Sequence, residues 1–125
     1  MRSGSSTNRT PLSTSARGRR AERRVAWHYR LRGYRILGRN VGSGGVELDL
    51  IVRRGRRLVF CEVKLKEGPG FGDPLEAVDE PKRARLRRGA ESWLIANPQL
   101  APLEIGFEFA AVRPGGVELV SDPLY

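Results

Sequence analysis

Two short apolar runs on either side of an arginine-rich turn constrain the fold of this chain more than any other feature. The runs cover residues 46–52 and 57–66, and their length and content of Val, Leu, Ile and Phe predict two β-strands. Residues 53–57 between them read Arg-Arg-Gly-Arg-Arg, a polar, glycine-centred segment that favours a hairpin. The middle of the chain is therefore predicted to form an antiparallel strand pair.

Charged side chains interrupt both predicted strands. Glu47 and Asp49 share one face of the first strand, because strand side chains alternate, and Glu62 and Lys64 likewise share one face of the second. Closing the hairpin brings three carboxylates and one ammonium group together beside an apolar sheet. Charges at such a place are costly unless they are paired or bind a metal, so this cluster is the main candidate site.

The same alternation predicts which apolar residues lie together. On the first strand, Leu48, Leu50 and Val52 are expected on one face, opposite the acids. On the second strand, Glu62 and Lys64 follow two apolar residues of their own face. They should therefore lie at the rim of a buried surface, where a ligand can approach.

The rest of the chain predicts one α/β domain at residues 17–125, with a mixed, partly antiparallel sheet and helices on its faces. Apolar periodicity predicts a first helix at 17–32, ended by Gly33, and a second from Pro81 to about Ala96. Further strands are expected at 34–41, 104–113 and 117–120, and a short turn at 75–77. Residues 1–16, rich in Ser, Thr and Gly, are interpreted as a disordered tail. Five residues of the second helix are expected to face the core: Ala84, Leu86, Ala90, Trp93 and Leu94.

The charge of the chain favours a polyanionic partner. The formal net charge is +9 and the pI about 10.9, which favours nucleic acid and, less strongly, an acidic membrane surface. No apolar run approaches the ~18 residues of a membrane span, no secretory signal is visible, and the single cysteine suits a reducing compartment, so a cytoplasmic location is expected. The candidate phosphate-binding cations are Arg53, Arg54, Arg56, Arg57, Lys66, Lys82, Arg83, Arg85, Arg87 and Arg88. The four hairpin arginines, Arg53, Arg54, Arg56 and Arg57, have an alternative interpretation, in which they only keep the turn solvated.

Asp49 and Glu62 together favour a divalent cation. Two close carboxylates repel each other, and a hard cation with oxygen ligands relieves the repulsion, with Mg²⁺ the best fit and Mn²⁺ a substitute. Lys64 beside such an ion could orient a water nucleophile or stabilise charge on a phosphate. The alternative is that Glu62 and Lys64 form a same-face ion pair on an edge strand. Glu22 on the first helix is expected to pair with a basic neighbour or to cap the first turn, or alternatively to point over the sheet towards the same site.

At this point the chain resembles the YraN family of small bacterial proteins, within the PD-(D/E)xK nuclease superfamily. The resemblance rests on an ordered set of segments: 18–22 with Glu22, 47–51 with Asp49, 58–64 with Glu62 and Lys64, 72–78, and 82–86. It implies a restriction-endonuclease-like or Holliday-junction-resolvase-like core. It also implies that Asp49, Glu62 and the carbonyl of Val63 ligate the metal, that Lys64 is catalytic and that Glu22 assists. Leu48 stands where the superfamily has its proline.

The expected function is metal-dependent cleavage of phosphodiester bonds in nucleic acid, with DNA favoured and branched DNA a candidate substrate. One rival is a non-catalytic nucleic-acid-binding protein that keeps the nuclease fold. Another is an adaptor whose basic face docks a DNA-processing partner. The resemblance to resolvases also raises the prospect of a homodimer, although the sequence shows no dimer surface.

Overall fold

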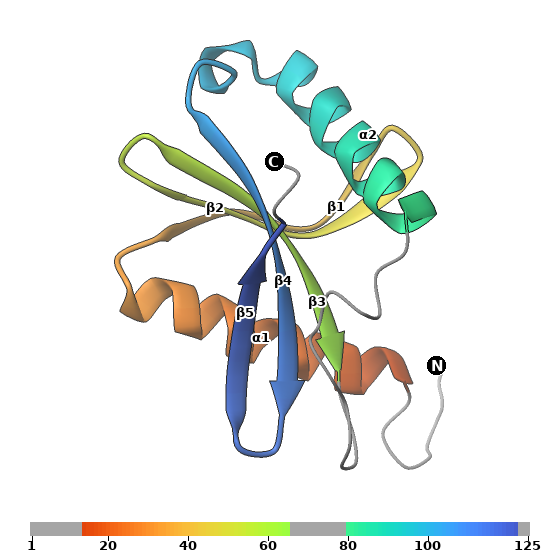
Figure 1. The fold of residues 1–125 in the computed structure, drawn as a ribbon, viewed down its shortest axis with the longest axis vertical. Coiled ribbons are helices and arrows are strands. Elements are labelled where there is room, and N and C mark those ends of the chain that lie inside the picture. The colour runs from red at the N-terminus through yellow and green to blue at the C-terminus, as the bar shows by residue number, and fades with distance from the viewer. Residues whose placement is uncertain (1–13, 66–79, 123–125) are drawn as a thin grey trace, which may run out of the picture.

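A computed structural model describes residues 14–65 and 80–122 of the chain. Two helices and a five-stranded sheet form its framework (Figure 1). The elements follow in the order α1 (Thr14–Leu31), β1 (Arg35–Ser43), β2 (Val46–Arg54), β3 (Arg57–Leu65), α2 (Glu80–Ala96), the short 3₁₀-helix η2 (Pro98–Leu100), β4 (Glu104–Arg113) and β5 (Gly116–Ser121). The predicted α/β class and the order of its elements are confirmed.

The strands lie in the sheet in the same order as in the chain, β1-β2-β3-β4-β5. Neighbouring strands are antiparallel except for β3 and β4, which are parallel. A parallel pair needs a crossover connection, and the stretch between β3 and β4 contains α2. The sheet is therefore mixed, as the sequence predicts.

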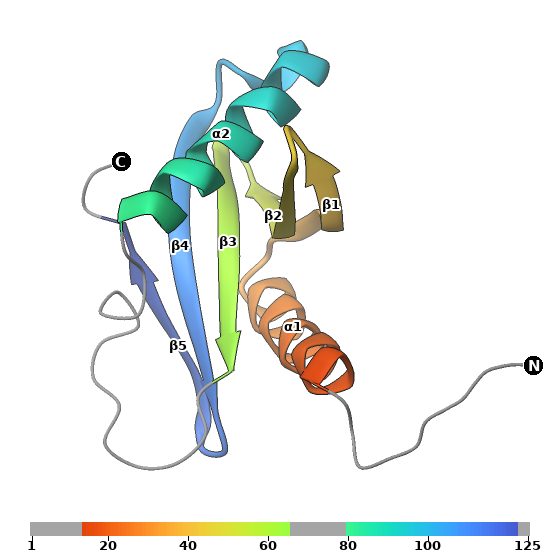
Figure 2. The same cartoon turned by 90° about the vertical axis from the view of Figure 1, so that its right-hand side faces the viewer.

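The two helices cover opposite faces of the sheet (Figure 2). Val25 and Tyr29 of α1 are buried against Val59 and Cys61 of β3. On the other face, Leu86 and Ala90 of α2 belong to a cluster that includes Leu58 and Phe60 of β3 together with Phe107 of β4. Strand β3 is thus buried on both faces over its first half.

The C-terminus of α1 is closed by a glycine turn, as predicted. The Gly33 N–H donates to the carbonyl of Arg30, and the Tyr34 N–H donates to the carbonyl of Tyr29, which is the Schellman pattern. Gly33 adopts φ +88°, a conformation that glycine reaches without steric cost. The rings of Tyr29 and Tyr34 then meet edge to face at a centroid distance of 5.1 Å. This turn sets the direction in which β1 enters the sheet.

The expected placement of Leu48, Leu50 and Val52 on one face of β2 is wrong. Leu50 and Val52 pack in the cluster under α1, whereas Leu48 packs with Ile51 in the cluster under α2. Pairing of β2 with β3 stops at Leu50 and Cys61, and β2 bends away beyond that point. The strict alternation of side chains therefore breaks between Leu48 and Leu50.

Helix boundaries differ slightly from the prediction, and one core residue was misplaced. Helix α1 begins at Thr14, so the last three residues of the predicted tail are helical. Ala84 of α2 is exposed, because it lies on the helix face opposite Leu86 and Ala90. The rest of the tail, the turn expected at 75–77 and Lys66 lie outside the described residues. Neither described helix combines the length and apolar character needed to cross a membrane.

Candidate functional site

Asp49 lies where β2 separates from β3. The last backbone pair between the two strands joins Leu50 to Cys61, and the Asp49 carboxylate then accepts a hydrogen bond of 2.9 Å from the Val63 N–H. The side chain of Asp49 thus takes over a donor that the departing strand leaves behind, as buried N–H groups require a partner. This contact fixes the carboxylate beside the second half of β3.

The environment of Asp49 opposes its ionisation. Its pKa is raised from 3.8 to about 7, first because the carboxyl group is buried and then because the charges of Glu62, Glu22 and Glu47 act on it. The hydrogen bond from the Val63 N–H acts against these effects and lowers the pKa of Asp49. Acids from α1, β2 and β3 are therefore close enough to act on Asp49, and Glu62, expected beside it, is one of them.

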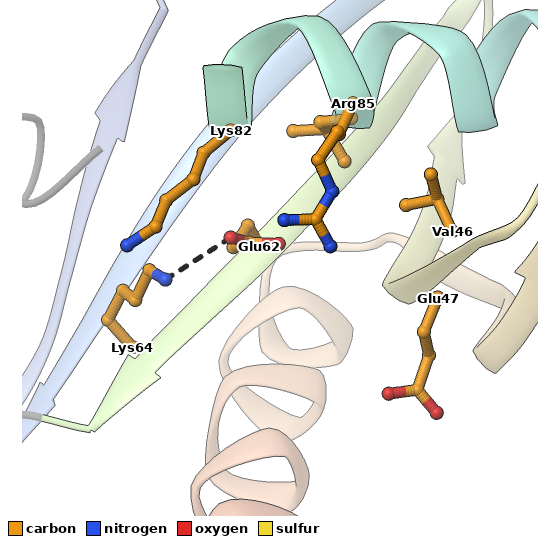
Figure 3. A pocket seen from close by; sticks show the side chains of 7 residues that line it. Val46, Glu47, Glu62, Lys64, Lys82 and Arg85 are labelled. Atoms are coloured by element: carbon orange, nitrogen blue, oxygen red, sulfur yellow. Dashed lines mark ion pairs between the residues drawn. The ribbon is translucent and has the colours of Figure 1, made fainter. Parts of the chain in front are cut away.

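Glu62 and Lys64 form an ion pair beside a pocket of about 200 Å³. Lys64 Nζ lies 3.3 Å from Glu62 Oε2, and both side chains are about one quarter exposed, at 25% and 22%. Figure 3 shows Arg85 reaching from α2 towards Glu62, whereas Lys82 extends towards Lys64 on the other side of this pocket. The predicted position of Glu62 and Lys64 at the rim of a buried surface is confirmed. Their ion pair, which the sequence left as an alternative, is also present, although it lies on the central strand.

Glu22 points towards the acidic cluster. It lines a second pocket, of about 370 Å³, together with Asn40 and Glu47, and the Asn40 side chain hydrogen-bonds to it. Burial and the charge of Glu47 raise the pKa of Glu22, while the bond to Asn40 lowers it. Asn40 holds a positive φ of 50°, a conformation that asparagine tolerates better than most residues. Glu47 lines both pockets and so connects Glu22 with the Glu62 side of the site.

The donor set suits a hard divalent cation held mainly by water. Within residues 14–65 and 80–122, no group of three or more His, Cys, Asp or Glu side chains is spaced to hold a metal ion. Mg²⁺, however, is commonly bound through one or two carboxylates and keeps several water ligands. Asp49 and Glu62 supply two such carboxylates. The resistance of Asp49 to ionisation is also what a nearby cation would relieve.

The basic residues of α2 divide into two groups. Lys82 and Arg85 line the pocket beside Glu62. Arg83 instead contacts the buried Asp122 at 2.8 Å and Glu80 at 3.8 Å, and Arg87 pairs with Glu80 at 3.0 Å. Arg88 is exposed. The structure thus brings only the first group into the site.

The arginines of the β2–β3 hairpin lie at the far end of β3. Arg57 is five residues from Glu62, or about 16 Å along a strand. These side chains hold local structure: Arg53 donates to the carbonyl of Gly55, Arg54 to that of Arg32 and Arg56 to that of Pro102, while Arg57 pairs with Glu108. They are neither a purely solvated turn nor neighbours of Asp49.

Sequence reasoning missed a polar network on the α1 face. Glu108 of β4 accepts hydrogen bonds from the Tyr29 hydroxyl, from Arg57 at 3.1 Å and from Ser121 at 3.4 Å. The sequence reasoning also missed Asn40, whose side chain hydrogen-bonds to Glu22. No local pattern marks these partners, since Tyr29 and Glu108 are 79 residues apart in the chain. Only the unusual place of an asparagine within a predicted strand could have drawn attention to Asn40.

Residues 21–112 match a family model described as "Uncharacterised protein family UPF0102". The chain belongs to this family. Among UPF0102 relatives, a protein of Frankia alni is 44% identical over 100 residues, covering 79% of this chain and 82% of the relative. One of Acidothermus cellulolyticus is 46% identical over 85 residues, covering 68% of this chain but 64% of the relative, so the match spans just under two thirds of that protein. The UPF0102 match includes Glu22, Asp49, Glu62 and Lys64.

Proposed function

We propose that this UPF0102 protein is a metal-dependent nuclease of the PD-(D/E)xK type that cleaves phosphodiester bonds, with DNA as the favoured substrate. One observation carries the proposal: Asp49, Glu62 and Lys64 meet where β2 and β3 part, beneath the basic residues Lys82 and Arg85. Glu62, Lys64, Lys82 and Arg85 line one pocket, and Asp49 is bonded to Val63, the residue between Glu62 and Lys64. Acids, a lysine and anion-binding cations placed in this way suit phosphoryl chemistry.

Asp49 and Glu62 would hold Mg²⁺ or Mn²⁺, with Glu22 and Glu47 acting at longer range. The bound ion would supply a more acidic water and a polarised phosphate. The Asp49 carboxylate is oriented for this role by the Val63 N–H, which holds one of its oxygens at 2.9 Å. In this proposal the Val63 carbonyl remains a further candidate ligand.

Lys64 is proposed to orient the attacking water and to screen charge that develops on the phosphate. Its ammonium group is 3.3 Å from Glu62, so it shares its position with the candidate metal ligand. Lys82 and Arg85 would hold the phosphate oxygens from the other side of the pocket. Binding through such contacts weakens as salt rises, because each neutralised phosphate releases condensed counterions.

A second candidate function is nucleic-acid binding without cleavage. The observation that favours it is the closed ion pair between Glu62 and Lys64, which occupies both groups with each other. In that case the pocket cations would bind phosphate, and the acids would contribute repulsion. Asp49→Asn would then leave the affinity for DNA unchanged or raise it.

Cleavage of a labelled substrate panel tests the proposal. Single-stranded, duplex, flapped and four-way-junction DNA and RNA are incubated with Mg²⁺, Mn²⁺ or EDTA. The wild type is compared with Asp49→Asn, Lys64→Met and the control Glu91→Gln, which removes a charge from an exposed position of α2. Metal-dependent cutting that the first two variants lose and the control retains would support the nuclease. If the wild type binds but does not cut, or all variants cut equally, the nuclease proposal fails.

A further inference from the structure

We propose that a third pocket, lined by Arg35, Arg53 and Arg54, binds a phosphate of the nucleic-acid backbone away from the candidate cleavage site. The choice of nucleic acid as the ligand rests on the proposed function. The pocket has a volume of about 370 Å³. Its lining among the described residues is completed by Gly33 and Gly55, so the lining includes three arginines and no acid.

Two turns build this pocket. Gly33 closes α1, and Gly55 lies in the β2–β3 hairpin, and both adopt a positive φ, +88° and +60°. At Gly33 a β-carbon would approach the Cδ atom of Arg54 to 3.4 Å, in a conformation that side chains rarely adopt. The pocket therefore depends on two chain reversals that bring the end of α1 beside the end of β2.

The cross-strand register places two like charges opposite each other. Arg35 of β1 is the partner of Arg53 of β2. Like charges directly opposite in a sheet destabilise it, and no acid of the pocket lining offsets them. A bound anion would offset this repulsion. An arrangement that costs stability in the free protein is therefore expected to serve binding.

Two of the arginines are held in place before any ligand arrives. Arg53 donates its Nε hydrogen to the carbonyl of Gly55 at 2.9 Å. Arg54 donates to the carbonyl of Arg32 at 2.8 Å, and its guanidinium carbon lies 4.8 Å from the ring centroid of Tyr34. Preorganised guanidinium groups lose less entropy on binding and match phosphate oxygens in pairs.

The separation of the two sites suits one stretch of nucleic acid. Arg53 is four residues from Asp49 on β2, about 13 Å along the strand. Each strand of B-DNA carries one phosphate per rise of about 3.4 Å, so that separation corresponds to about four base pairs. The arginine pocket would thus hold the backbone a few nucleotides from the bond in the candidate cleavage site.

Salt-dependent binding of a labelled DNA duplex tests the inference. The wild type, Arg35→Gln, Arg53→Gln and the control Arg23→Gln, an exposed residue of α1, are titrated in EDTA at several KCl concentrations. Each pocket variant should weaken binding about threefold more than the control and reduce the slope of log K against log salt by about one. Thermal melting shows that the variants are folded, and Arg35→Gln should melt at or above the wild-type temperature. Pocket variants that match the control, or a wild type that does not bind duplex, would overturn the inference.

A charge-retaining variant separates shape from charge. Arg35→Lys keeps the cation but loses the planar fork, so it should keep the salt slope while weakening binding. Because EDTA prevents metal-dependent cutting, these results are independent of the nuclease. A pocket effect without any cleavage by the wild type would sustain the inference and defeat the nuclease proposal. If the wild type cleaves, Asp49→Asn does not, and the pocket variants bind like the control, the nuclease proposal is supported and the inference about the arginine pocket fails.

Discussion

The Asp49 carboxylate accepts a hydrogen bond from the Val63 N–H at the point where β2 and β3 cease to pair. One side chain therefore both ends a strand ladder and presents an acid with a pKa of about 7 to the acidic cluster. Local structure and candidate chemistry depend here on the same atoms.

Stability should depend on pH through Asp49. Its pKa is about 7 in the folded protein and 3.8 as the ordinary value, so the folded state keeps a proton that the unfolded state releases. The resulting stabilisation is full below about pH 4 and is lost as pH rises to 7, with a size of up to about 4 kcal/mol. Asp49→Asn keeps a hydrogen-bond acceptor for Val63 and should flatten this dependence. Urea unfolding in EDTA between pH 4 and 8 measures it, and a curve identical to that of wild type would contradict the assignment.

The ion pair between Arg83 and Asp122 should matter more than its neighbour on the same helix. Asp122 has a side chain only 2% exposed, and Arg83 contacts it at 2.8 Å. Arg83→Met would leave a buried charge without this partner and should cost about 3–5 kcal/mol of unfolding free energy. Arg87→Met, which breaks an exposed pair with Glu80, should cost about 1 kcal/mol or less. Equal costs in urea unfolding would show that Asp122 does not anchor α2.

Gly89 should resist substitution because α2 lies close to the β1–β2 hairpin there. A β-carbon at this position would lie 3.1 Å from both Leu48 Cδ2 and Val46 Cβ, and 3.3 Å from the Ser43 carbonyl oxygen. Gly89→Ala should therefore destabilise the fold by about 1–3 kcal/mol. Gly18→Ala on α1 meets nothing within 4 Å and should stabilise by about 0.5–1 kcal/mol. Thermal melting compares the two, and a neutral Gly89→Ala would mean that α2 can shift away from the sheet.

The two groups of cations on α2 should differ in nucleic-acid binding. Lys82 and Arg85 line the pocket of Glu62, whereas Arg87 is paired with Glu80. Arg85→Gln and Lys82→Gln should each reduce the salt slope of DNA binding by about one, and Arg87→Gln should change it less. Fluorescence anisotropy across a KCl series measures the slopes. A uniform loss across all three variants would indicate diffuse attraction to the whole helix.

Local signals predicted the elements well because each boundary has a local cause. Gly33 ends α1 through its positive φ, Gly55 turns the central hairpin, and alternation marked β4 at its observed bounds. The site cluster followed from the same rules, since Glu62 and Lys64 share a face of β3. Such features depend on residues a few positions apart.

Long-range partners set the limits of that reasoning. Arg83 resembles its helical neighbours in sequence, and only the fold reveals Asp122 beside it. Arg57 likewise pairs with Glu108 on the neighbouring strand, although its side chain is still 38% exposed. The bend in β2 moved Leu48 to the other face because the ladder with β3 stops, an event that no pattern within β2 records.

The order of strands in the sheet has a consequence for the kinetics of folding. Three of the pairings join strands separated by tight turns, and such hairpins form within about 1–10 μs. Pairing of β3 with β4 must close a loop spanning residues 66–103, which includes α2. We therefore expect the rate-limiting step to be the docking of α2 and β4 onto β3, so that substitutions in this interface slow folding. A stopped-flow φ value near zero for Leu86→Ala would contradict this order, because the contacts of α2 would then form only after the rate-limiting step. The candidate site, which needs both β3 and α2, is therefore expected to form only at this slow docking step.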